Sequence, residues 1–113
     1  MIVAHCDDET IFGGYDLLQN NNWTVIVITN PSSNKKNKHR KDEFINISKK
    51  VNFKYEFWNY KNDKHSVKDW NINEIITRID NLIKKNNFNM ILTHNLKGEY
   101  GHLHHKTIHT ILY

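Results

Sequence analysis

Short apolar runs alternate along the chain with longer stretches in which apolar residues recur every three or four positions. Apolar runs bounded by polar residues are typical of strands covered on both faces, and recurrence at three and four is typical of helices. Strands are predicted at residues 1–4, 23–29, 53–58 and 89–93. Helices are predicted at residues 9–20, at about 39–50, at 72 to about 85, and from 102 onward.

Two of the predicted helices have distinctive sequences. The helix at 72–85 has the most regular apolar spacing: Ile72, Ile75, Ile76, Ile79, Leu82 and Ile83. Asn71 followed by Glu74 is typical of a capped helix start. The helix at 9–20 carries four apolar residues on one face, the pattern of an amphipathic helix: Ile11, Phe12, Tyr15 and Leu18.

The alternation of strands with helices indicates the fold class. Such alternation implies right-handed crossovers, a mostly parallel sheet and a Rossmann-like α/β fold of three layers. Ligands of these folds bind beyond the carboxyl ends of the strands. Polar candidates fall at all four predicted strand ends: His5, Asp7 and Asp8, then Asn30, then Asp63, and finally the segment 94–105.

Composition limits the class of protein. The chain has 113 residues, enough for one domain with a single core. Hydrophobic residues make up 38% and charged residues 25%, which is typical of a soluble globular protein. No apolar run approaches the ~20 residues of a membrane-spanning helix, and no signal peptide precedes the first strand, so we expect a cytoplasmic protein without a transmembrane segment.

The net charge of +4 comes largely from a basic stretch after Pro31: Lys35, Lys36, Lys38, Arg40 and Lys41. A basic patch can bind nucleic acid or acidic headgroups. No aromatic residue is interleaved with these side chains, so we interpret the stretch as a flexible solvated loop and expect no nucleic-acid partner. The sequence does not predict the oligomeric state.

Two segments carry candidate chemistry: Ala-His-Cys-Asp-Asp-Glu-Thr-Ile-Phe-Gly-Gly at 4–14 and Gly-Glu-Tyr-Gly-His-Leu-His-His at 98–105. His5 and Asp8 lie three apart across a predicted strand-to-helix turn, close enough to bind one ion. With His105 they form a three-ligand set that leaves a fourth position for water, as in catalytic zinc sites. Zinc lowers the pKa of such a water toward about 7 and polarises a carbonyl.

The residues leave alternatives open for each ligand. His5 and Asp8 could instead form a helix-capping turn around a buried histidine. His104 stands beside His105, but the three-residue spacing from His102 favours His105, and His104 would then point elsewhere on the helix. His102 could stabilise the oxyanion or protonate the leaving amine. As a fourth ligand, His102 would close the site and make the zinc structural.

Neighbouring residues have candidate supporting roles. Asp7 lies on the other side of the turn from the ligand pair and is the natural general base, or alternatively a carboxylate that orients a ligand histidine. Glu9 opens a helix, where the dipole favours a carboxylate, and we interpret it as structural. Tyr100 could donate to an oxyanion formed in the reaction or stack on a substrate, and His94 could support the site.

The same two segments resemble a known family. His-Cys-Asp-Asp-Glu followed by Gly13-Gly14 resembles the A-H-P-D-D-E signature of the LmbE-like, or PIG-L, N-acetylglucosaminyl deacetylases. Gly-Glu-Tyr-Gly-His-Leu-His-His resembles that family's second signature, a glycine-rich loop ending in H-x-x-H. The resemblance implies an LmbE-like fold and a zinc-dependent hydrolase. Such an enzyme uses metal-activated water to remove acetyl from an N-acetylglucosamine-type sugar or glycoconjugate.

The resemblance also assigns roles to residues: His5, Asp8 and His105 as metal ligands, Asp7 as general base and His102 as a second catalytic residue. It implies that Arg40, within a sequence similar to the family's arginine-led helix start, lines the substrate pocket. It likewise implies that Asp63 meets sugar hydroxyls. Solvated surface positions are the alternative for Arg40 and Asp63.

Two departures from the family pattern bear on function. Cys6 stands where the family has proline; it could itself bind metal, but we expect it to face the core. The chain stops at Tyr113, soon after His105, whereas family members continue with further strands, so we expect a single deacetylase domain (1–113) that is incomplete at its C-terminal end. The alternative function is a catalytically inactive domain of the same fold that binds glycan or holds zinc structurally.

Overall fold

The computed structural model describes residues 1–20, 22–32 and 38–113. Within them, three parallel strands form one sheet in the order β1 (Ile2–Val3), β2 (Thr24–Thr29), β3 (Lys54–Tyr60). The helices are α1 (Asp8–Gln19), α2 (Lys38–Val51), α3 (Ile72–Lys85), the single turn α4 (Gly98–Gly101) and α5 (Leu103–Leu112). The α/β class and the parallel sheet predicted from the sequence are confirmed.

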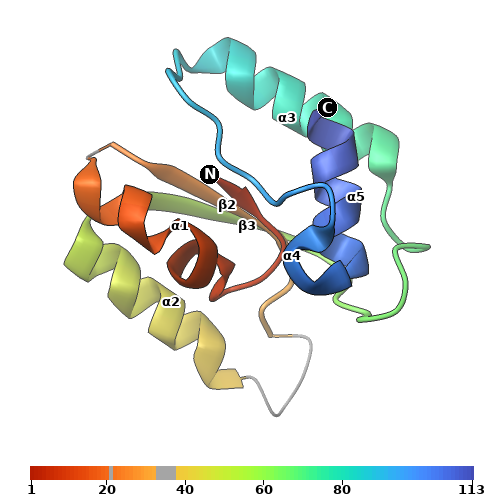
Figure 1. Ribbon diagram of the computed structural model, residues 1–113, viewed down its shortest axis with the longest axis horizontal. Coiled ribbons are helices and arrows are strands. Elements are labelled where there is room, and N and C mark those ends of the chain that lie inside the picture. Colours follow the sequence, from red (N-terminus) through yellow and green to blue (C-terminus); the bar gives the residue numbers. More distant parts are fainter. Residues whose placement is uncertain (21, 33–37) are drawn as a thin grey trace.

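Helices cover both faces of the sheet and make three layers (Figure 1). Successive side chains of a strand point to opposite faces, so β2 sends Val25 and Val27 to one core and Ile26 and Ile28 to the other. The first core is completed by α1 and α2, and the second by α3 and α5. Because β2 is buried on both faces, its sequence is a continuous apolar run rather than an alternating one.

The prediction of a fourth strand at 89–93 is wrong. This segment pairs with β1 only through a bridge between Ile2 and Thr93 and a hydrogen bond from Ile2 N to Leu92 O (2.9 Å). Side chains take the next positions of the ladder: Thr93 Oγ1 donates to Ile2 O, and the Ala4 N–H donates to His94 Nε2. A regular backbone ladder therefore ends after one bridge.

The apolar face predicted for α1 does not pack against the sheet. Its four members are between 42% and 76% exposed: Ile11, Phe12, Tyr15 and Leu18. The buried face carries Asp8, Glu9, Gly13 and Leu17 instead. A Cβ at Gly13 would clash with the Met1 side chain, so the glycine allows the helix to approach the sheet on this face. The same orientation directs Asp8 into the protein.

The other helices agree closely with the predicted ranges. The Asn71 side chain caps α3 by accepting from Glu74 N (3.1 Å), as its sequence predicted. Of the basic stretch after Pro31, residues 33–37, with Lys35 and Lys36, lie outside the described residues, whereas Lys38, Arg40 and Lys41 begin α2. Among the described residues no helix combines the length and apolarity needed to span a membrane.

Candidate metal centre

Three donor atoms from opposite ends of the chain form an equilateral triangle. His5 Nδ1, Asp8 Oδ2 and His105 Nε2 lie 3.3 Å from one another on all three sides. A tetrahedral zinc ion with bonds of about 2.0–2.1 Å separates its ligands by about 3.3–3.4 Å. The three side chains are almost completely buried, with 9%, 3% and 0% exposure respectively. The triangle thus has the size and the donor chemistry of a zinc site.

The fold positions these ligands at the carboxyl end of β1. His5 follows the strand, and Asp8 is the first residue of α1. The tight turn between them places Asp7 at a φ of 135° and lets the His5 N–H donate to Asp8 Oδ2 (2.8 Å). His105 comes from the first turn of α5, which contacts β1. The predicted alternative of a capping turn alone does not account for His105 beside this pair.

Charge at the triangle favours a cation. Burial alone would raise the pKa of Asp8, but the nearby rings of His105, His5 and His94 outweigh burial and hold this pKa well below its usual range. For His105, burial would lower the pKa, and the contacts with Asp8 and Glu99 outweigh it and raise the pKa. Asp8 is therefore an anion inside the protein, with histidine nitrogens around it.

Glu99 determines which nitrogen of His105 faces the triangle. Glu99 Oε2 lies 2.8 Å from His105 Nδ1 and 3.2 Å from His94 Nδ1. Because a carboxylate accepts hydrogen bonds, His105 carries its proton on Nδ1 and leaves the Nε2 lone pair free. The His94 ring stacks on His105 (centroids 3.7 Å apart) and accepts the Ala4 N–H at Nε2. His94 thus supports the site, as the sequence suggested.

The expectation that His104 points elsewhere on the helix is wrong, because its side chain is directed into the site. It is fully buried, and its Nδ1 lies 3.0 Å from His5 Nε2. Its Nε2 lies 2.7 Å from Asp63 O and 3.2 Å from Ser66 O. Carbonyl oxygens only accept, so His104 carries its proton on Nε2 and accepts at Nδ1. His5 must then donate from Nε2, which leaves its Nδ1 lone pair facing Asp8.

Two other groups of potential ligands overlap with the triangle: His5, His102 and His104, and His94, Glu99 and His105. In the first, the His5 and His104 nitrogens are joined by a hydrogen bond that requires a proton between them. In the second, both histidine nitrogens donate to Glu99. Within the described part of the chain, the triangle is therefore the group whose donor atoms all keep free lone pairs.

The other predicted catalytic residues surround the triangle. His102 is the N-cap of α5, where its Nδ1 accepts the His104 N–H (3.2 Å). Burial, and then the neighbouring histidines, lower the pKa of His102 to about 4, so its ring is neutral at pH 7 with the proton on Nε2. Tyr100 is 71% exposed, and its ring meets His102 and His105 edge-on. Its partial burial, and then the Asp8 carboxylate, raise the pKa of Tyr100, so its hydroxyl stays protonated and can donate.

Arg40 reaches the site through Asp7. Its Nη2 donates to Asp7 Oδ2 from the first turn of α2, and both side chains are partly exposed. Glu9 supports the same turn, because its Oε2 accepts the Asp7 N–H (2.9 Å). Glu9 is buried, and burial raises its pKa. Cys6 packs in the core as expected, and burial, then Glu9, raises the pKa of its thiol to about 12.

Asp63 is brought to the histidines by its backbone and not by its carboxylate. Its carbonyl accepts from His104, whereas its Oδ1 accepts the His65 N–H within the same loop (3.2 Å). Sequence reasoning assigned no role to Glu99 and none inside the site to His104. The glutamate between Gly98 and Gly101 was the available signal, because a carboxylate in a histidine-rich loop is a common partner of ligand histidines.

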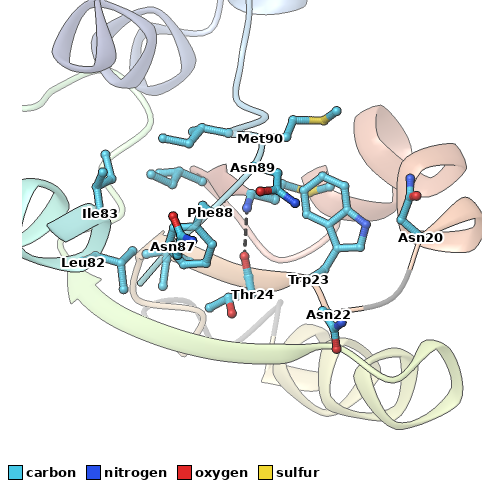
Figure 2. A pocket seen from close by; sticks show the side chains of 14 residues that line it. Asn20, Asn22, Trp23, Thr24, Leu82, Ile83, Asn87, Phe88, Asn89 and Met90 are labelled. Atoms are coloured by element: carbon cyan, nitrogen blue, oxygen red, sulfur yellow. Dashed lines mark hydrogen bonds between the residues drawn. The ribbon is translucent and has the colours of Figure 1, made fainter. Parts of the chain in front are cut away.

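A separate cavity of about 390 Å³ lies at the opposite end of the sheet (Figure 2). Its lining combines apolar residues with amides and a hydroxyl and includes Trp23, Thr24, Phe88, Asn89 and Met90. None of its lining residues is a histidine, a cysteine or a carboxylate, so it offers no side chain suited to a catalytic metal.

Comparison with known proteins gives two matches. The family model described as "PIG-L: GlcNAc-PI de-N-acetylase" matches residues 1–113. An uncharacterised protein of Acanthamoeba polyphaga mimivirus is 43% identical over 125 residues, a match that covers 100% of this chain and 55% of that protein. The chain therefore spans about half the length of this curated relative. No solved structure matches.

Proposed function

The chain belongs to the PIG-L family, and on this premise we propose that it is a zinc-dependent deacetylase that removes the N-acetyl group from an N-acetylglucosamine-type sugar conjugate. The observation that carries the proposal is the triangle of His5, Asp8 and His105, with sides of 3.3 Å. Three protein ligands leave a fourth position open, which is the arrangement of catalytic rather than structural zinc. Zinc bound there would polarise the acetyl carbonyl and activate a water molecule.

Asp7 is the proposed general base. Arg40 engages its Oδ2, which leaves Oδ1 to accept a proton from the attacking water. The guanidinium fixes the carboxylate in one orientation and adds positive charge beside it. Water adds to the acetyl carbon to give a tetrahedral intermediate, and the collapse of this intermediate breaks the C–N bond. The proton held by Asp7 passes to the nitrogen, and the products are acetate and a free amine.

His102 is the proposed donor to the carbonyl oxygen. Its Nδ1 is occupied by the His104 N–H, so the neutral ring presents Nε2–H. A neutral donor of this kind stabilises negative charge as it develops on the oxygen. Tyr100, exposed beside His102, offers an aromatic face and a hydroxyl to the sugar. Arg40 is further proposed to line the substrate pocket, and Asp63 to contact sugar hydroxyls.

Zinc content and acetate release together test this function. We expect about one zinc per chain in the wild type, and its loss in His5→Ala and in His105→Ala. Asp7→Asn should retain zinc and lose acetate release from N-acetylglucosamine conjugates by about 10²–10⁴-fold, the range for a general base. The exposed His65 gives a matched control, because His65→Ala removes a histidine outside the triangle.

Three outcomes decide between the candidate functions. A folded wild type without zinc would contradict the proposal, and so would full activity in Asp7→Asn. Zinc bound with no acetate release from any N-acetylglucosamine conjugate would favour the alternative, an inactive domain of the same fold. The presence of Cys6 where the family signature has proline is the observation that favours this alternative, because proline would stiffen the turn that carries His5 and Asp8.

A further inference from the structure

We propose that His104 is a positioning residue that makes His5 bind metal through Nδ1 and anchors the loop after β3 to the metal centre. The proposal deepens the proposed function and rests on it to the extent that His5 is a metal ligand. His104 itself supplies no ligand atom to the triangle. It acts through His5 on one side and through the loop carbonyls on the other.

The position of His104 calls for a specific explanation. Its side chain is fully buried, with its ring 4.8 Å from that of Trp70. A buried polar ring is costly unless both nitrogens have partners, and an apolar residue would fill this space at no such cost. Both nitrogens do have partners, His5 on one side and the carbonyls of Asp63 and Ser66 on the other. Because carbonyl oxygens only accept, these partners allow one arrangement: His104 carries its proton on Nε2 and accepts at Nδ1.

The first consequence concerns the tautomer of His5. Its Nδ1 lies 3.3 Å from Asp8 Oδ2, a carboxylate oxygen. Left to this neighbour alone, the ring would carry its proton on Nδ1 and donate to Asp8, and the lone pair needed for the metal would be lost. His104 offsets this preference, because its Nδ1 accepts from His5 Nε2. The proton of His5 is thus held on the side away from the metal.

The second consequence concerns the loop between β3 and α3. His104 Nε2 donates to Asp63 O and Ser66 O, the two residues that also form an isolated antiparallel bridge. The Trp70 indole closes the same loop by donating to Lys61 O (2.8 Å). His104 therefore fixes the loop that carries Asp63, a proposed sugar contact, relative to the ring of a metal ligand.

Three variants separate the two contacts of His104. The amide of asparagine places its oxygen near the position of Nδ1, so His104→Asn keeps an acceptor for His5 and loses the bond to the loop. The longer glutamine places its nitrogen near the position of Nε2, so His104→Gln keeps the loop and loses the acceptor. His104→Phe loses both contacts and still packs beside Trp70. His65→Asn, on the exposed part of the same loop, is the matched control.

The tautomer of His5 is measured by ¹⁵N NMR of the ring in the metal-free protein, so this readout does not depend on activity. We expect the Nε2–H form in the wild type, in His65→Asn and in His104→Asn. In His104→Gln and His104→Phe we expect the Nδ1–H form to appear. Hydrogen exchange at the Ser66 N–H, which donates to Asp63 O, should accelerate in His104→Asn and His104→Phe but not in His104→Gln.

Zinc affinity is the second readout. Loss of a partner that orients a ligand histidine costs about 10- to 100-fold in metal affinity. We expect this loss in His104→Gln and His104→Phe, and near wild-type affinity in His104→Asn. An unchanged His5 tautomer in folded His104→Phe would overturn the inference. Absence of zinc binding in the wild type would overturn the proposed function, whereas the tautomer of the metal-free protein decides the role of His104 separately.

Discussion

Glu99 adopts a backbone conformation that is uncommon for a residue with a side chain, with φ of 62° and ψ of −74°. Such a conformation costs about 1–3 kcal/mol and persists where the surroundings determine it. Here the carboxylate accepts the Asn95 N–H at Oε1 and the Nδ1–H groups of His94 and His105 at Oε2. Asn95 returns a bond, because its Oδ1 accepts the Glu99 N–H. Both carboxylate oxygens are therefore needed as acceptors.

Glu99→Gln should weaken the metal centre with almost no change of shape. A glutamine must place its NH₂ group against either the Asn95 N–H or the two histidine donors, so one donor is left unpaired. We predict that the free energy of unfolding falls by about 1–3 kcal/mol. We also predict that zinc affinity falls by about 10- to 100-fold, because His105 is no longer oriented.

Isothermal titration with zinc and urea unfolding measure the two effects of Glu99→Gln. Glu43→Gln, on the exposed surface of α2, is the control for removal of one negative charge. Equal zinc affinity in Glu99→Gln and Glu43→Gln would contradict the assigned role of Glu99.

At the scale of the element, α1 is oriented by its buried carboxylates and a glycine and not by its apolar residues. Two adjacent leucines show this orientation: the side chain of Leu17 is 4% exposed, whereas that of Leu18 is 75% exposed. We predict that Leu17→Ala lowers the free energy of unfolding by about 2–5 kcal/mol, the usual cost of a cavity in a core. Leu18→Ala should change this free energy by no more than about 0.5 kcal/mol.

Urea unfolding of the two variants tests the orientation of α1, since alanine has a high helix propensity at both positions. If the apolar face predicted from the sequence were the buried one, the order of the two effects would be reversed.

Local patterns predicted the elements well, and contacts across the fold account for the misses. The continuous apolar run of β2 and the Asn71 cap of α3 are read from neighbouring residues alone. The failure of the strand at 89–93 depends on Thr93 and His94 side chains taking backbone partners in β1. The orientation of α1 depends on Gly13 meeting Met1. Neither contact can be predicted from the spacing of apolar residues along the sequence.

In the candidate site, too, some features are predicted from the sequence and others depend on contacts across the fold. Spacing and residue type indicated His5, Asp8 and His105, and the structure brings these three together. The parts played by His104 and Glu99 depend on which ring nitrogen faces which partner. That property exists only when the two ends of the chain are folded together.

At the scale of the whole molecule, histidines concentrated at one site couple folding to pH. The pKa of His102 is lowered to about 4 by burial and then by neighbouring histidines, from an ordinary value of 6.5. The unfolded chain therefore binds this proton at higher pH than the folded chain does. The stability gained from a neutral His102 is complete above about pH 6.5 and is lost as the pH falls toward 4. Protonation also removes the Nδ1 acceptor that caps α5.

We predict that the metal-free protein unfolds at progressively lower urea concentration as the pH falls from 6.5 to 4. Asparagine caps helices without titrating, so His102→Asn should reduce the slope of stability against pH in this window. His39→Asn, at an exposed position of α2, should leave the slope unchanged. The same slope in His102→Asn and the wild type would show that other groups account for the pH dependence. The raised pKa of His105 does not oppose the effect, because its contribution is lost only as the pH rises above 6.5.

The separation of His5 and His105 by 100 positions has a consequence for the life of the protein in a cell. An ion held by both would join two segments 100 positions apart, and it would oppose unfolding because the site that binds it exists only in the folded chain. Each tenfold rise in free zinc above the dissociation constant would add about 1.4 kcal/mol to stability. Metal supply would then set the fraction of molecules open to proteases, and zinc starvation would reduce the abundance of the protein as well as its activity.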